Sequence, residues 1–104
     1  MDRRIHPRFW TSPRVMCVSR DARLLLIGLF SRVSEYGVAF ECSSSEMRAL
    51  IFPSDPLSSG DVDELMRELI RARLVEVELA GEEWVGGILT ATADLAGQNA
   101  VLRG

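Results

Sequence analysis

Apolar residues recur at helical spacing in the first third of the chain. They fall at positions 22, 25, 26, 29, 30 and 33, which is the i, i+3, i+4, i+7 pattern of an amphipathic helix. Ser19 is placed to cap this helix, and Asp21 lies in its first turn, where a carboxylate suits the helix dipole. Gly37 suits the position just after a helix end. The pattern therefore predicts a largely buried helix over about residues 19–36.

Two further helices are predicted in the middle of the chain. Ser43 and Glu46 have the spacing of a capping box, which predicts a short helix over about residues 44–51. Another helix is expected to begin after Ser58 or Ser59. Its apolar face consists of Val62, Leu65, Met66, Leu69 and Ile70. Its last turn is basic and contains Arg71 and Arg73.

Alternation of apolar and charged residues begins at Val75 and continues to Leu79. A second run, from residue 84 to residue 89, follows a four-residue connection that contains Gly81, so the two runs predict a β-hairpin. Residues 38–40 fit a short strand. The order helix, short strand, helix, helix, hairpin predicts an α+β domain of the winged helix-turn-helix class, with three helices and the C-terminal hairpin as its wing.

The two ends of the chain are patterned differently from its middle. Pro7 and Pro13 disfavour a continuous helix, so residues 1–18 are expected to form an extended arm rich in basic and aromatic residues. Residues 19–90 are then expected to form the winged-helix domain, and residues 91–104 a weakly structured tail.

Charge is distributed unevenly, although the net charge of the chain is only −3. All twelve basic residues are arginine, whose planar, forked guanidinium binds phosphate well. Residues 1–34 hold seven arginines and two acids, a net charge of +5, whereas residues 35–104 hold five arginines and thirteen acids, a net charge of −8. Because a local basic patch can bind nucleic acid on an acidic protein, we expect the N-terminal third to supply it.

The rest of the composition excludes several classes of function. No apolar run approaches the roughly 20 residues that span a bilayer, and no signal-peptide pattern follows the charged N-terminus, so we expect a cytoplasmic protein with no membrane partner. Cys17 and Cys42 are expected to be small, partly buried residues. With His6 they lack the number and spacing of metal ligands, and the chain contains no known catalytic motif. We therefore expect no enzyme activity, metal or cofactor.

Several short stretches together resemble a known family. They are Arg4 to Trp10, Leu24 to Phe30, Tyr36-Gly37, Ile51-Phe52-Pro53 and Leu69 to Val75. In order and spacing, over roughly residues 3–90, they resemble the N-terminal winged-helix domain of actinobacterial and phage replication-initiation proteins, the replisome-organiser or DnaD-like class. The resemblance implies a phage- or prophage-derived domain that binds DNA or mediates self-association, and that acts in replication initiation or transcriptional regulation.

Charge disfavours DNA binding through the third predicted helix and the wing. The third helix of winged-helix proteins commonly enters the major groove, but here acids occupy its first turns and the wing tip. Because carboxylates repel phosphates, we expect arginines of the arm and first helix to contact duplex or single-stranded DNA, with later arginines as secondary contacts. The expected DNA-binding residues are Arg3, Arg4, Arg8, Arg14, Arg20, Arg23, Arg32, Arg48, Arg67 and Arg71. A solvated, salt-bridged surface is the alternative interpretation of these arginines.

A protein-interaction module on the same scaffold is the second interpretation. The acidic helix and wing would then meet a basic replication or transcription protein or a second copy of the chain, and the hairpin edge could pair with another strand. Phe9 and Trp10 are expected to anchor the arm on the core, with stacking on unpaired bases as the alternative, and Trp84 to lie in the core or at an interface. The expected interaction residues are Trp10, Trp84, Asp61, Glu64, Glu82 and Glu83.

Replacing Arg3, Arg4 and Arg8 together with alanine should weaken DNA binding and lower its dependence on salt, because each lost phosphate contact reduces the number of counterions released. Titration of labelled duplex, forked and single-stranded DNA at low and physiological salt measures both effects. Unchanged affinity in the triple variant would remove the arm from the interface.

Overall fold

Hydrogen-bonding side chains start the helices where the sequence predicts. A computed structural model describes residues 7–33, 39–81 and 83–90. The hydroxyl of Ser19 accepts a bond from the N–H of Ala22 at 3.2 Å, and Ser43 and Ser58 each form a capping box with the acid three positions later. The elements in chain order are η1 (Pro7–Thr11), α1 (Pro13–Met16), α2 (Arg20–Phe30), β1 (Ala39–Phe40), α3 (Ser44–Ile51), α4 (Ser59–Arg71), β2 (Val75–Ala80) and β3 (Glu83–Leu89). The helix predictions for residues 44–51 and for the segment after Ser58 are confirmed.

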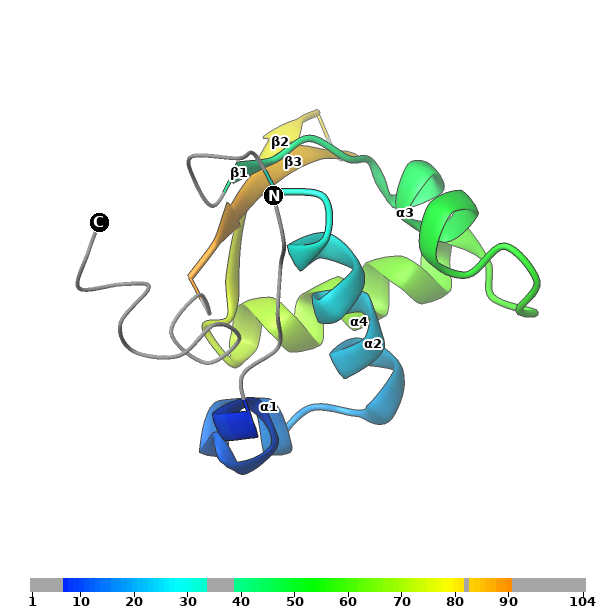
Figure 1. Cartoon of the computed structure of the whole chain (residues 1–104). Coiled ribbons are helices and arrows are strands. Elements are labelled where there is room, and N and C mark those ends of the chain that lie inside the picture. Colours follow the sequence, from blue (N-terminus) through cyan, green and yellow to red (C-terminus); the bar gives the residue numbers. More distant parts are fainter. Residues whose placement is uncertain (1–6, 34–38, 82, 91–104) are drawn as a thin grey trace.

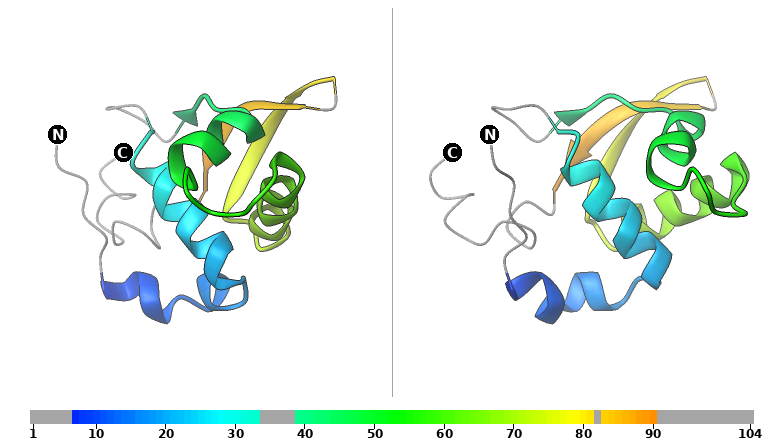
Figure 2. Two further views of the ribbon diagram at one scale, coloured as in Figure 1. Left: turned by 90° about the vertical axis from the view of Figure 1, so that its right-hand side faces the viewer. Right: turned by 45° about the vertical axis from the view of Figure 1, so that its right-hand side comes forward.

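The three strands form one antiparallel sheet in the order β1-β3-β2. β2 and β3 are the predicted hairpin, which turns at Gly81 with a φ of 69°, a left-handed conformation that glycine adopts without strain. The helices gather on one side of this sheet (Figures 1 and 2). The chain is therefore an α+β domain whose helices precede a C-terminal β-hairpin.

The apolar face of α4 lies at the centre of the core. Its buried residues contact α2, α3 and β2, and each fully buried side chain of this size contributes about 1.5–3 kcal/mol to stability. They are Val62, Leu65, Met66 and Leu69. α2 meets α3 at Gly28, where an added Cβ would lie only 2.7 Å from Cδ1 of Ile51. A larger residue at Gly28 would therefore displace the side chain of Ile51 or push the two helices apart.

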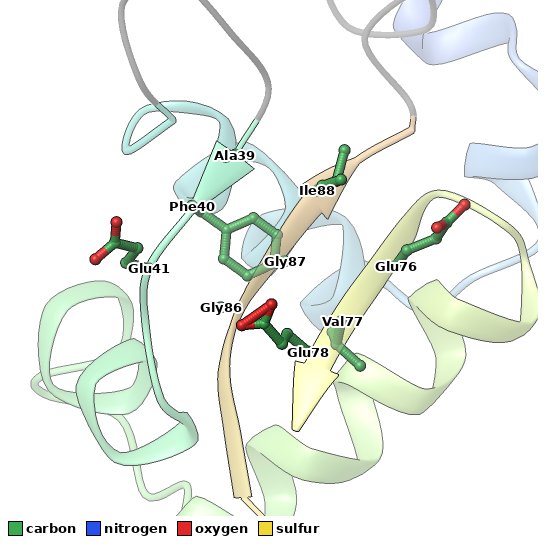
Figure 3. A pocket seen from close by; sticks show the side chains of 9 residues that line it. All are labelled: Ala39, Phe40, Glu41, Glu76, Val77, Glu78, Gly86, Gly87 and Ile88. Carbon is green, nitrogen blue, oxygen red and sulfur yellow. The ribbon is translucent and has the colours of Figure 1, made fainter. Parts of the chain in front are cut away.

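Close packing within the sheet depends on a second glycine, Gly87 on β3. A Cβ at this position would lie 2.9 Å from Cζ of Phe40 and would overlap the carbonyl oxygen of Glu76. Because Gly87 has no side chain, the ring of Phe40 can lie across β3 and stay almost fully buried (Figure 3).

The arm expected over residues 1–18 is not extended in the part that the structure describes, residues 7–18. η1 and α1 are both helical, and Pro13 stands in the first turn of α1, where its missing N–H costs no helical bond. Phe9 and Val15 are fully buried, so this segment belongs to the domain. Phe9 anchors it as predicted, whereas Trp10 meets the Phe9 ring edge-on and stays 57% exposed.

The first predicted helix ends at Phe30, earlier than the expected end near residue 36. Oγ of Ser31 donates to the carbonyl of Gly28 at 2.6 Å. A side chain that takes a helix carbonyl competes with the next helical bond. The following backbone bonds, from Arg32 to Leu29 and from Val33 to Phe30, accordingly span three residues in place of four. The helix therefore closes in a tighter turn, and Gly37 lies outside the described residues.

Replacing Phe9 with alanine should lower the free energy of unfolding by about 3–5 kcal/mol, because it leaves a cavity in the core. The neighbouring Trp10→Ala substitution is the control and should cost less than about 1.5 kcal/mol, mainly through the lost ring contact. Urea denaturation of both variants measures the difference. Equal and small losses would contradict the inclusion of residues 7–16 in the domain.

Candidate nucleic-acid interface

Three segments that are distant in the sequence meet at one end of the molecule: α1, the start of α2 and the end of α4 (Figure 1). Nη1 of Arg14 donates to the carbonyl of Arg73 at 2.8 Å. The backbone N–H and the hydroxyl of Ser19 donate to the two carboxylate oxygens of Glu68 at 2.8 and 2.9 Å. These bonds fix the N-terminal segment and α2 to the last turns of α4.

Arginine dominates this end of the molecule. The three segments are residues 13–16, 19–23 and 68–73. They carry five arginines and two acids. Both acids are engaged, Glu68 with Ser19 as described and Asp21 with Nε of Arg20 at 4.0 Å. We use the name basic end for the side chains of Arg14, Arg20, Arg23, Arg71 and Arg73.

Arg73 takes its place in the basic end through an unusual backbone conformation. α4 ends in a Schellman motif, in which the N–H of Arg73 donates to Ile70 and the N–H of Leu74 donates to Leu69. Arg73 follows the helix cap with a φ of 61°, in the left-handed region, which costs a residue other than glycine roughly 1–2 kcal/mol. Arg73 is not among the residues that the sequence predicts to bind DNA. Glycine, the usual signal for such a turn, is absent at this position.

Two other arginines expected to bind DNA are engaged elsewhere. Arg48, on α3, donates from Nε to the carbonyl of Leu57 at 2.7 Å. Arg67, midway along α4, pairs with Glu64, and its guanidinium carbon lies 5.9 Å from the ring centroid of Trp84. Of the remaining expected residues, Arg8 and Arg32 are exposed, and Arg3 and Arg4 lie outside the described residues. The structure thus brings together four of the expected arginines, those of α1, α2 and the last turn of α4.

Acids surround the starts of α3 and α4, and they serve the fold. Asp61 accepts a bond from the N–H of Ser58 at 2.9 Å, and Glu46 forms the matching bond at the start of α3. The hydroxyl of Ser44 donates to Asp63 and so joins α3 to α4. These acids leave the start of α4 negatively charged, although a helix N-terminus is otherwise well suited to phosphate.

The residues expected at a protein interface lie on several different elements. Trp84 is only 7% exposed, so its ring lies in the core, which was one of its two expected locations. Asp61 and Glu64 are exposed on α4, and Trp10 is exposed on η1. Glu82 lies outside the described residues, and Glu83 begins β3.

The two cysteines differ in their surroundings. Cys42 is buried, and burial raises the pKa of its thiol. Cys17 is exposed, contrary to the expectation of partial burial, and its thiol donates to the carbonyl of Arg14 at 3.0 Å. Within residues 7–33, 39–81 and 83–90, no three His, Cys, Asp or Glu side chains are grouped as metal ligands. None of the helices in this part of the chain has the length and apolar character of a bilayer-spanning segment.

Comparisons with known proteins identify no relative of this chain. No protein-family model, curated protein or solved structure matches it. The interpretation of the basic end therefore depends on the chemistry of its own residues.

Acid should destabilise the domain partly through Glu46. Hydrogen bonds from the backbone and side chain of Ser43 lower the pKa of Glu46 below its ordinary value of 4.5. The bonded carboxylate therefore stabilises the fold above pH 4.5, and this contribution is lost as the pH falls through the folded-state pKa. The Glu46→Gln variant keeps a capping residue, so its Tm should fall less on acidification. Thermal unfolding from neutral pH to about pH 3 measures this, and equal losses in both proteins would contradict the bonded carboxylate.

Proposed function

We propose that this chain is a winged helix-turn-helix domain that binds nucleic acid through the basic end. The order of elements from α2 to β3 and the sheet order β1-β3-β2 support the winged-helix assignment, with α3 and α4 as the helix pair and the β2–β3 hairpin as the wing. Clustered arginines support phosphate binding, because the guanidinium group forms two parallel hydrogen bonds to phosphate oxygens.

The left-handed backbone conformation of Arg73 is the observation that most strongly supports this proposal. Glycine would be the most stable residue in its left-handed position, yet the chain holds an arginine there. Its carbonyl accepts bonds from Arg14 and, at 2.7 Å, from Oγ1 of Thr90. Backbone strain of this kind tends to persist where a position serves a function. Among the described residues, neither Arg71 nor Arg73 forms an ion pair, so both guanidinium groups remain available to phosphate.

The proposed contact differs from insertion of a helix into the major groove. Asp61 and its acidic neighbours would face phosphates at the start of α4, whereas the basic end lies at the opposite end of this helix. Contacts to phosphate position a protein on nucleic acid without reading its sequence. We therefore expect weak sequence preference and strong salt dependence. The resemblance to replication-initiation proteins favours a role in replication initiation, with transcriptional regulation as the alternative role.

The Arg73→Gly variant should bind nucleic acid more weakly while being at least as stable as the wild type. Loss of one phosphate contact should lower the affinity roughly tenfold, equivalent to about 1.4 kcal/mol, and reduce the salt slope by about one. Relief of the left-handed strain should offset the added freedom of glycine in the unfolded chain. Fluorescence titration of labelled duplex, forked and single-stranded DNA, together with urea denaturation, measures both properties.

Arg67→Gln is the matched control because it removes the same charge from the middle of α4. Its affinity for DNA should stay within about twofold of the wild type, since Arg67 already contacts Glu64 and Trp84. A larger loss in Arg67→Gln than in Arg73→Gly would contradict the basic end and favour insertion of α4. Absence of saturable binding at low salt would overturn the proposed function altogether.

A further inference from the structure

β2 is an edge strand. The sheet order β1-β3-β2 gives it β3 as its only strand neighbour among residues 7–33, 39–81 and 83–90, and in Figure 3 no strand lies on its other side. An exposed strand edge is a template for pairing with another extended chain. The edge therefore raises the question of which chain it would accept.

The register shows which backbone groups face outward. The N–H of Thr90 donates to the carbonyl of residue 74 at 3.0 Å, so these two residues form a hydrogen-bonded pair. Such pairs alternate along an antiparallel ladder. Glu76 and Glu78 therefore bond to β3, whereas Val75 and Val77 direct their N–H and C=O groups away from the sheet.

The two faces of this edge have different chemistry. Val75 is buried and Val77 half-buried, and with Ile70 of α4 they line a hollow of about 560 Å³ beside the strand. Arg14 and Arg73 of the basic end also line this hollow. Glu76 and Glu78 are exposed on the other face. A chain added along this edge would thus meet valines on one face and glutamates on the other.

A second hollow adds to the negative charge of the exposed face. It has a volume of about 530 Å³ and crosses all three strands next to Glu76 and Glu78. Ile88 and the adjoining glycines supply apolar and backbone surface there, and Glu41 contributes a third carboxylate (Figure 3). Such a hollow suits a long basic side chain, whose aliphatic stem can cover apolar surface while its charge meets carboxylates.

We propose that the β2 edge binds an extended segment of a partner protein in which apolar and basic residues alternate. The segment adds a fourth strand to the sheet, with apolar residues beside Val75 and Val77 and basic residues beside Glu76 and Glu78. Backbone hydrogen bonds supply affinity in this mode of recognition, and the alternating side chains supply specificity. This site adjoins the basic end, and binding of the strand does not require nucleic acid.

Charge argues against a second copy of the chain as the occupant. Two β2 strands related by a two-fold axis would pair antiparallel through Val75 and Val77. When Val75 pairs with Val77, Glu76 lies opposite Glu76 of the other copy. When Val77 pairs with Val77, Glu76 lies opposite Glu78. Like charges on neighbouring strands are destabilising. A basic partner strand turns the same glutamates into attractive contacts.

Amide hydrogen exchange of the isotope-labelled full chain tests the proposal with a capped peptide that alternates valine and lysine. The amides of Val75 and Val77 should exchange rapidly in the protein alone and become protected when the peptide is added. Those of Glu76 and Glu78 should be protected throughout. A capped peptide that alternates valine and glutamate should bind at least about tenfold more weakly.

Backbone methylation of the peptide supplies a matched pair of controls. In a strand added antiparallel to β2, the valine amides face β2, so methylating them should weaken binding about tenfold or more. The lysine amides face away, so methylating them should change the affinity little. The Glu76→Arg/Glu78→Arg variant should reverse the preference and select the valine–glutamate peptide. Arg73→Gly should bind the valine–lysine peptide at least as tightly as the wild type, because it removes a positive charge beside the strand.

Three results would overturn the proposal. One is protection of Val75 and Val77 in the protein alone at every concentration, which would show that this chain already covers the edge. Another is protection that rises with protein concentration, which would assign the edge to a second copy. The third is equal affinity for the two methylated peptides, which would exclude strand addition. None of these results alters the DNA titration, so failure here is distinguishable from failure of the proposed function.

Discussion

The domain depends on burial of the apolar face of α4. This helix contacts α2, α3 and β2, and four of its side chains are buried in the core. With one face committed to the interior, the polar residues of α4 must lie on its remaining surface. Its start therefore presents capping acids, and its end presents Arg71 and Arg73. The same helix that organises the core thus separates negative from positive charge at its two ends.

Much of this arrangement could be predicted because its causes are local. The apolar stripe of α4 recurs at helical spacing, and Ser43 and Ser58 cap their helices through acids three residues later. The hairpin follows from alternation on both sides of Gly81. In each case the side chains that determine the element lie within a few residues of it in the sequence.

The features that the sequence does not predict depend on contacts between distant residues, or on a residue type that is unusual for its backbone conformation. Pro7 and Pro13 suggest an extended arm, but Phe9 and Val15 are held in a core built mostly by later residues, and this burial stabilises helical turns. Arg73 occupies a left-handed position without the glycine that marks such turns. The arginines gathered at the basic end could be identified one by one, whereas their proximity depends on bonds between residues about 50 or more positions apart.

The basic end and the β2 edge adjoin, because Arg14 and Arg73 line the same hollow as Val75 and Val77. A basic strand on β2 would be repelled by these arginines when they are unoccupied. Phosphate bound at the basic end would neutralise them and so favour the same strand. Coupling between two binding sites is reciprocal, so the strand would in turn raise the affinity for nucleic acid. Because charges are screened over about 8–10 Å at moderate salt, this coupling would be strongest at low ionic strength.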